Sequence, residues 1–270
     1  MSHFSATFFA MHAMASSGID GIERSNSEED HANRIIHIEL LTYVALPKMR
    51  EFYEKKLGLP VLEDRPNRLS IQAGLSTLTF TPANAIDGKP FYHFAFNIPQ
   101  NKIKLAREWQ LKRTPLLPIP PQLRDPEYPV DVVNYSHWNA HSVFFFDPAG
   151  NVVEYIARHD IKNSATGPYT PKDILCISEI AFVSDDVATI ADKLKETAGV
   201  TQYRGGSDQF MALGDENGLL LVMKRGRIIS FDAPEKKAVS VFGTHATVSG
   251  KSAGKLALPG YPYTIDIKSK

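Results

Sequence analysis

The sequence predicts an α+β protein made of repeated units, with curved, mostly antiparallel sheets and helices on the outside. The same order of elements, a strand followed by a helix and then antiparallel strands, starts again near residues 34, 91 and 177. The proposed helices carry apolar residues at helical spacing, and the proposed strands are short runs rich in β-branched and aromatic residues. Three such units account for most of the 270 residues.

The first unit opens with the strand "RIIHIELLTY", residues 34–43. A helix follows, because Pro47 suits a first helical turn and Gly58 suits a C-terminal cap. The apolar face of this helix is formed by Met49, Phe52, Tyr53 and Leu57. Two β-type runs, residues 68–74 and 76–82, complete the unit.

The second unit opens with "FYHFAFNIP", residues 91–99, and continues with a helix around Ile103, Ala106 and Trp109. Residues 114–139 are too rich in proline for regular structure and too long for a simple connection. Loops of this length are typical of lids and binding loops, and a rigid surface loop without a ligand is the alternative. The unit ends in the hairpin "HSVFFFDPAGNVVEYIAR", residues 141–158.

The third unit, residues 174–225, contains the strand "ISEIAFVSDD", a helix that Ser184 would cap and Gly199 would end, and two strands joined at "ENG". Residues 226–270 form a C-terminal tail whose "YPYTIDI" is expected to add an edge strand. Residues 1–33 are small, polar and aperiodic after a short apolar patch, which predicts a disordered leader. That patch lacks the features of a secretory signal, although a weak signal or a true start at Met14 is left open.

Composition limits the classes of partner. Thirty basic residues balance thirty acidic ones without a basic stripe, which argues against nucleic acid, and no run of apolar residues is long enough to cross a membrane. A small-molecule substrate is therefore the expected partner, while a homodimer is left open. The single cysteine, Cys176, lies in an apolar run and reads as core filling in a cytoplasmic protein.

Strand alternation brings polar side chains to one face. Glu154 stands alone among apolar residues in the hairpin, and a buried carboxylate needs a hydrogen-bonding, charged or metal partner. The turn "DPAG" predicts Phe144 opposite Glu154, with His141 on the other side. The side chains expected on the concave face are His37, Glu39, His93, Ala95, Asn97, Ser142, Phe144, Glu154 and Ile156.

Two histidines and a carboxylate from three strands are able to bind a divalent metal and leave coordination positions open. His37, His93 and Glu154 are therefore the predicted ligands of one metal ion. The alternative is that each histidine is a hydrogen-bonded core residue, because spacings of 56 and 61 residues carry no local signature.

Three stretches, "HIELLTYVALPKMREFYEKKLGL", "HFAFNIP" and "FFFDPAGNVVEYIAR", resemble the vicinal oxygen chelate superfamily, which includes glyoxalase I, extradiol dioxygenases and the fosfomycin and bleomycin resistance proteins. The resemblance covers residues 34–158. It implies βαβββ modules paired into a U-shaped sheet around a metal-holding cavity, with residues 34–160 as one paired-module domain. Its usual ligands map onto His37, His93 and Glu154.

The resemblance also has gaps. A fourth ligand would fall near Thr77 and is missing, and Glu179 stands in the third unit where a histidine would be expected. The third unit is therefore interpreted as a structural half-domain without metal, with a second site there as the alternative. The metal itself, Fe, Zn, Mn or Ni, is not specified by the sequence.

Departures from the family pattern bear on the reaction. Ring-cleaving members usually have a tyrosine where Phe144 stands and an active-site histidine between the two ligand histidines, which this chain lacks. Asn134 and Phe144 do not supply the lysine and tyrosine of fosfomycin-modifying members. An isomerase or lyase is therefore favoured, with Glu39 as general base or as an acceptor that orients a ligand.

The expected substrate is small and oxygenated, and Asn97, Ser142 and Phe144 are expected to line its pocket. The alternative function is a non-catalytic binding or sequestering protein of the bleomycin-resistance type.

Overall fold

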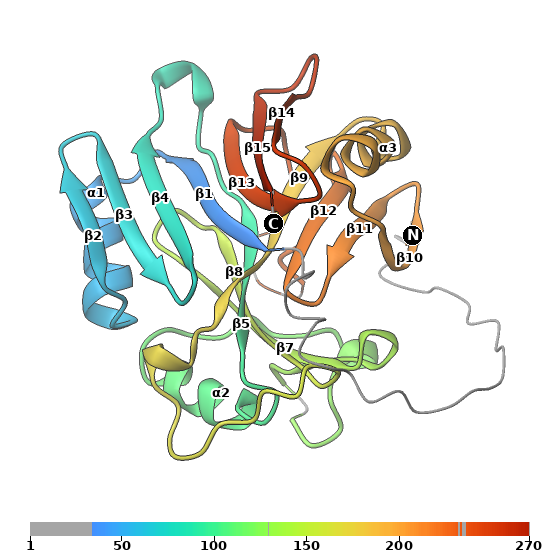
Figure 1. The fold of residues 1–270 in the computed structure, drawn as a ribbon. Coiled ribbons are helices and arrows are strands. Elements are labelled where there is room, and N and C mark those ends of the chain that lie inside the picture. The colour runs from blue at the N-terminus through green and yellow to red at the C-terminus, as the bar shows by residue number, and fades with distance from the viewer. Residues whose placement is uncertain (1–33, 129, 232, 234–235, 270) are drawn as a thin grey trace, which may run out of the picture. The chain divides into compact units, whose positions relative to one another are not determined.

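The computed structural model describes residues 34–269 except 129, 232, 234 and 235, and the leader predicted over residues 1–33 lies outside the described residues. The described residues form one continuous sheet of fifteen strands with three α-helices, which lie on the outside of the sheet (Figure 1). The α+β class predicted from the sequence is confirmed.

The elements fall into three complete modules and a shorter fourth. The first comprises β1 (Ile35–Thr42), α1 (Leu46–Arg50) continued by the π-helical turn η2 (Glu51–Lys56), β2 (Val61–Arg65), β3 (Arg68–Ala73) and β4 (Ser76–Pro82). The second comprises β5 (His93–Ile98), α2 (Ile103–Leu111), β6 (Val133–Tyr135), β7 (Ala140–Phe146) and β8 (Val152–Arg158). The third comprises β9 (Cys176–Ser184), α3 (Val187–Ala198), β10 (Gln202–Ser207), β11 (Phe210–Asp215) and β12 (Gly218–Lys224). The fourth comprises β13 (Thr244–Gly250), β14 (Gly254–Ala257) and β15 (Tyr263–Ser269).

Local signals set most helix ends. Pro47 lies in the first turn of α1, and Gly58 follows η2 with a φ of 70°, a conformation that favours glycine. α3 ends at Gly199, which is also left-handed. Its N-cap is Asp186, whose side chain accepts a hydrogen bond from the Thr189 N–H; the predicted cap, Ser184, instead donates to the Asp186 carbonyl oxygen.

Each module pairs its first strand in parallel with its last strand: β1 with β4, β5 with β8, β9 with β12 and β13 with β15. Modules then join through their first strands, because β5 runs antiparallel to β9 and β1 runs antiparallel to β13. A single bridge, Ile35 opposite Ile177, connects the two pairs of modules into one sheet.

This pairing differs from the one expected for residues 34–160. The second module pairs with the third, and the first module pairs with the tail. The tail contributes three strands and therefore does more than extend an edge. Because strand pairing joins residues far apart in the chain, the alternation within each strand reveals its faces but not its partner.

Apolar side chains on the face opposite His93 form the core. Phe94 and Phe96 of β5 pack with Tyr155 of β8 and with Ala106 of α2 in one buried cluster. In the third module Phe182 and Leu194 belong to the same cluster. A helix therefore covers one face of each of the three complete modules, and the polar side chains lie on the other face.

The hairpin between β7 and β8 is held by the buried carboxylate of Asp147. Its Oδ1 accepts hydrogen bonds from the backbone N–H groups of Ala149 and Asn151, both at 2.9 Å. Its Oδ2 accepts from the Tyr53 hydroxyl and the Asn151 side chain, both at 2.7 Å. Gly150 follows with a φ of 73°. The turn thus fixes the hairpin register and ties the second module to η2 of the first.

Replacing Asp147 with alanine removes four hydrogen bonds and leaves several buried donors without an acceptor. We expect Asp147→Ala to lower the free energy of unfolding by about 3 kcal/mol or more. Urea denaturation followed by circular dichroism measures this change. Asp64→Ala is the control, because Asp64 makes an exposed ion pair with Arg50 and its loss should cost less than about 1 kcal/mol. Equal losses in the two variants would contradict the prediction.

Candidate metal centre

Three neighbouring strands bring two carboxylates and a histidine together around Ala95. β5 lies between β8 and β9, with Ala95 opposite Glu154 on one side and opposite Glu179 on the other. His93 comes two residues earlier and therefore points to the same face. Alanine has a short side chain, so it leaves room for the longer acidic side chains to converge.

The ligand atoms of His93, Glu154 and Glu179 all lie within 4.8 Å of one another. Nε2 of His93 is 3.5 Å from Glu154 Oε2 and 3.8 Å from Glu179 Oε2. All three side chains are buried. Oε1 of Glu154 has no hydrogen-bond partner among the described residues, which is costly for a buried carboxylate. Imidazole and carboxylate are ligands that divalent metals bind, so this donor set fits a metal ion.

The histidine is oriented for ligation. Nδ1 of His93 lies 2.9 Å from the Val152 carbonyl oxygen, which only accepts hydrogen bonds, so Nδ1 carries the proton of the neutral ring. Nε2 then faces the two carboxylates, which is the arrangement of a metal-binding histidine held by a backbone carbonyl. Burial lowers the pKa of His93, but the nearby Glu179 and Glu154 outweigh it and raise the pKa above its usual value.

The two acids are held differently. Burial, followed by the charge of Glu179, raises the pKa of Glu154 to about 8. Glu179 Oε1 accepts a hydrogen bond from Nη2 of Arg158, a fully buried arginine on β8. Arg158 therefore fixes one oxygen of Glu179 and leaves Oε2 turned towards His93.

Tyr135 was not identified from the sequence, because it lies in the proline-rich stretch where no periodicity marks a strand. It belongs to β6, which pairs with β7 and places Tyr135 opposite Ala140. Burial, together with the charges of Glu154 and Glu179, raises the pKa of Tyr135 well above its usual range. Its phenol is thus a proton-bearing group near the two acids.

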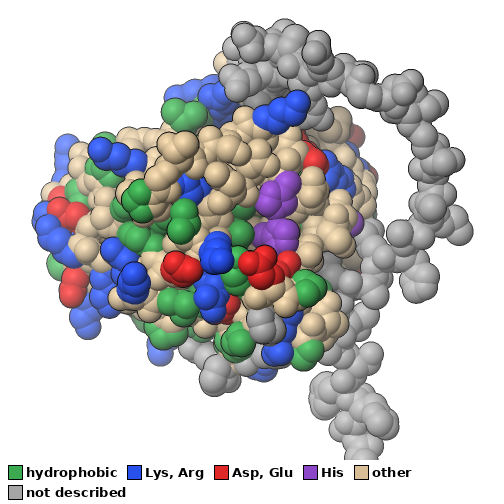
Figure 2. Space-filling view, turned by 90° about the horizontal axis from the view of Figure 1, so that it is seen from below, with side chains coloured by type: hydrophobic (Ala, Val, Ile, Leu, Met, Phe, Trp, Pro, Cys, Tyr) green, Lys and Arg blue, Asp and Glu red, His purple; other side chains and the backbone are tan. Residues whose placement is uncertain are grey.

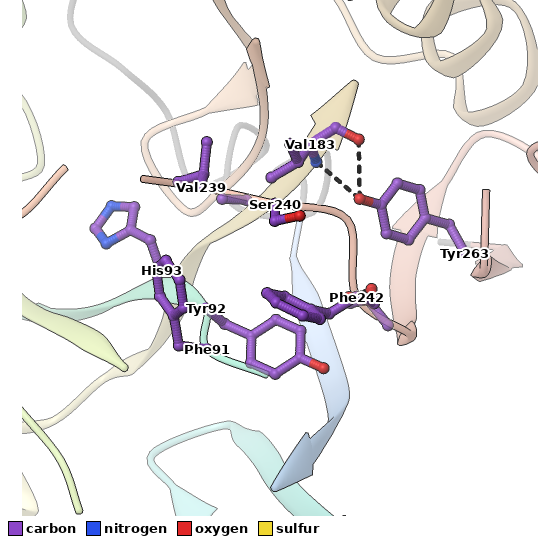
Figure 3. A pocket seen from close by; sticks show the side chains of 10 residues that line it. Phe91, Tyr92, His93, Val183, Val239, Ser240, Phe242 and Tyr263 are labelled. Carbon is purple, nitrogen blue, oxygen red and sulfur yellow. Dashed lines mark hydrogen bonds between the residues drawn. The ribbon is translucent and has the colours of Figure 1, made fainter. Parts of the chain in front are cut away.

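Part of the chain between β12 and β13 lies against the same face. The Phe231 ring packs on Phe144 of β7, with ring centroids 4.7 Å apart. Val239, Ser240 and Phe242 line a small pocket together with His93. Figure 3 shows His93 at one side of this pocket and Tyr263, whose hydroxyl bonds with the backbone of Val183, at the other. This segment therefore shields the candidate centre from solvent.

The structure does not bring His37 and Glu39 to this centre. Both lie on β1, which pairs with β4 and β13. His37 Nε2 is 2.9 Å from Thr79 Oγ1, and Glu39 accepts a hydrogen bond from Arg68 at 2.7 Å. The predicted ligand set is thus corrected: His93 and Glu154 come together, and Glu179 of the third module takes the place expected for His37.

His37 nevertheless occupies a position equivalent to that of His93. In the pair formed by the first and fourth modules, Glu39 lies opposite Thr79 and His245, as Ala95 lies opposite Glu154 and Glu179. The sequence pattern therefore selected equivalent positions in the first and second modules, but these two modules belong to different module pairs.

The three predicted pocket residues surround the acids. Phe144 lies opposite Glu154 as expected, and its ring is 6.1 Å from that of His93 between centroids. Asn97 and Ser142 both lie opposite Ile156, one on each side of β8. Whether they contact a substrate stays a prediction.

His141 lies away from this group. Its Nδ1 is 2.7 Å from Nε2 of His159, and its Nε2 is 3.0 Å from Asp125 Oδ2. On the face seen in Figure 2, positive and negative side chains are interspersed and histidine side chains lie next to each other.

No helix among the described residues is long and apolar enough to cross a membrane.

Comparison with known proteins supports the fold. A putative dioxygenase from Bacillus subtilis superposes with a TM-score of 0.55 and 15% identity, covering 89% of this chain and 86% of that one. Glyoxalase I from Zea mays gives a TM-score of 0.50 and 14% identity, covering 90% and 94% of the two chains. No family model and no curated protein sequence matches the chain. The chain therefore shares the fold of glyoxalase I and of this putative dioxygenase, which is the fold that the motifs predicted.

The buried pair of Arg158 and Glu179 gives a stability prediction. Glu179→Ala leaves the Arg158 guanidinium buried without a counter-ion and should lower the free energy of unfolding by about 3 to 5 kcal/mol. Combining Glu179→Leu with Arg158→Met should recover most of this loss, because no charge is then left unpaired. Urea denaturation of the metal-free proteins measures both effects. A single variant as stable as the parent would show that the pair is dispensable.

Proposed function

We propose that this protein is a metal-dependent enzyme that binds one divalent ion through His93, Glu154 and Glu179 and acts on a small oxygenated substrate. The convergence of three buried ligand atoms within 4.8 Å is the observation that supports the proposal most directly. The unpartnered Oε1 of Glu154 adds to it, because a cation would supply the missing interaction.

An isomerase or lyase fits these residues better than a ring-cleaving dioxygenase. When bound, a divalent ion supplies a Lewis acid that polarises a substrate oxygen. The half-buried phenol of Tyr135, whose pKa is raised by burial and by the charges of Glu154 and Glu179, would hold or deliver a proton near the carboxylates. Glu39, predicted from the sequence as general base or as an acceptor that orients a ligand, belongs to the other module pair and is hydrogen-bonded to Arg68. Tyr135 is therefore the better candidate for proton transfer at this centre. Phe231 and Phe144 would exclude water.

A non-catalytic binding protein is the second candidate. Arg158 already neutralises Glu179, which offers the chain a way to bury this carboxylate without a metal. Both candidates bind a small molecule in the cytoplasm, as the composition predicts. They differ in whether metal is needed, which makes metal content the deciding measurement.

Protein purified without chelator or affinity metal should carry about one divalent ion per chain, with ligand atoms within about 2.0 to 2.3 Å of it. Glu154→Ala should lower occupancy at least about tenfold because it removes a ligand. Inductively coupled plasma mass spectrometry of protein dialysed against defined metal gives the occupancy.

Two histidine variants are matched controls for this measurement. His37→Ala and His141→Ala each remove an imidazole outside the candidate centre and should leave occupancy unchanged. Loss of metal in His37→Ala with retention in Glu154→Ala would move the site to β1. Parent protein that takes up no metal would favour the binding-protein candidate.

The reaction class is tested separately. Apo-protein loaded anaerobically with Fe(II), mixed with a panel of catechols and exposed to oxygen, should show neither oxygen uptake nor yellow ring-opened product. Phe144 offers no hydrogen bond at the position where ring-cleaving enzymes usually have a tyrosine. Rapid turnover that disappears in Glu154→Ala would make this protein a dioxygenase.

A further inference from the structure

Polar atoms around Ile156 are left without partners on the face of the candidate centre. Glu154, Ile156 and Arg158 alternate along β8, so they point to the same side. Asn97 and Ser142 lie opposite Ile156 on β5 and β7. Since adjacent strands lie about 4.8 Å apart, these four polar side chains surround one apolar residue at short range.

Among these four polar side chains, Arg158 has two hydrogen-bond donors without a partner, which is more unpartnered atoms than any of the others. It is 1% exposed, and within the described part of the chain its hydrogen bonding is limited to Nη2, which donates to Glu179 Oε1. Among the described residues, Nε and Nη1 of Arg158 have no acceptor, and neither does Oδ1 of Asn97 have a donor. Buried guanidinium donors are rarely left unpaired, because their desolvation is not compensated. The guanidinium lies 5.6 Å from the centroid of the Trp138 ring, and its free donors are groups to which an anionic ligand can bind.

Charge balance leads to the same ligand class. Glu154 and Glu179 contribute two negative charges, and Arg158 contributes one positive charge. A divalent cation bound with neutral His93 would leave one net positive charge in a buried site. A monoanion would restore neutrality, which is the favourable state for a desolvated group of charges.

The position of Arg158 also sets the size of the ligand. Glu179 reaches Arg158 with Oε1 and the candidate centre with Oε2. The guanidinium is thus separated from the centre by little more than one carboxylate group. A molecule that contacts both needs its anionic group and a second oxygen on adjacent carbon atoms.

We propose that the substrate is a small 2-oxo or 2-hydroxy carboxylate whose carboxylate accepts a hydrogen bond from one of the two free donors of Arg158, Nε or Nη1. The neighbouring oxygen then lies towards His93, Glu154 and Glu179. This inference rests on the proposed function, because it takes those three residues to hold a divalent ion. Arg158 acts both as the partner of Glu179 and as the residue that selects for an anion.

The test compares glycolate with hydroxyacetone, a neutral molecule of similar size that keeps the hydroxyl next to a carbonyl carbon. Full-length protein loaded with Mn²⁺ is titrated with each compound, and binding is followed by isothermal titration calorimetry and by water-proton relaxation of the Mn²⁺. Glycolate should bind at least tenfold more tightly than hydroxyacetone. Equal affinities in the parent protein overturn the inference, whatever the behaviour of any variant.

Variants assign the preference to Arg158. Arg158→Met should abolish the preference for glycolate, and Arg158→Lys should retain part of it. Arg113→Met is the matched control, because Arg113 stacks on Trp109 of α2 and bonds to the Lys56 carbonyl oxygen away from the centre. An unchanged preference in a folded Arg158→Met protein overturns the assignment to Arg158.

Failure of the inference and failure of the proposed function give different results. Mn²⁺ binding without discrimination between the two probes rejects the carboxylate class and leaves the metal centre intact. Absence of Mn²⁺ binding in the parent protein rejects the proposed function, and the inference falls with it.

Discussion

The antiparallel pairing of β5 with β9 is the contact on which the candidate centre depends. β5 is also paired with β8, so it holds the strands that carry Glu154 and Glu179 on its two sides. The strand register sets Ala95 between the acids, and a slip of one residue would turn either carboxylate to the helix-covered face. The turn at Asp147 secures the register of β8 from the other side. The convergence of charges is thus a consequence of backbone pairing.

Burying two acids in one place needs compensation from the surroundings. Their mutual repulsion and the loss of solvation both favour the protonated form, as the raised pKa of Glu154 indicates. Arg158 compensates Glu179, while Oε2 of Glu154 lies 3.5 Å from Nε2 of His93. Arg158 occupies Oε1 of Glu179, whereas Oε1 of Glu154 has no hydrogen-bond partner among the described residues. The two carboxylates therefore differ in the oxygen atoms that they can offer to a ligand. Because only one of the two carboxylates is paired with an arginine, binding a cation would stabilise the site.

Sequence reasoning succeeded where the signal is local. Alternation along β5 and β8 placed His93 and Glu154 on one face, and the "DPAG" turn gave the register that sets Phe144 opposite Glu154. Helix boundaries at Pro47, Gly58 and Gly199 likewise follow from short-range conformational preferences. Each of these features is decided by a few neighbouring residues.

The same reasoning failed where distant strands choose partners. The sequence contained Glu179, but nothing near it showed that β9 would lie beside β5 while β1 would lie beside β13. Tyr135 was missed because β6 has only three residues and lies in a segment without periodicity. Arg158 was not singled out from the sequence, and the structure buries it against Glu179 of the third module.

The two module pairs show how far equal positions differ in chemistry. In the pair formed by β1 and β13, Thr79 occupies the place of Glu154, and His245 occupies the place of Glu179. His37 is satisfied by Thr79, and His245 Nε2 lies 2.6 Å from Asp266 Oδ2. Glu39 occupies the position equivalent to Ala95, so the space that the short alanine leaves is absent here. The Glu39 carboxylate accepts a hydrogen bond from Arg68.

The polar side chains named in the pair formed by the first and fourth modules therefore each have a hydrogen-bond partner. Glu154 Oε1, in contrast, has no partner among the described residues. The fold supplies equivalent positions in both module pairs. In the pair formed by the second and third modules, Ala95 lies between two acids, and this arrangement brings together negative charges that a cation would balance. It follows that His37 and His93, which look alike in the sequence, differ because of what their neighbouring strands carry.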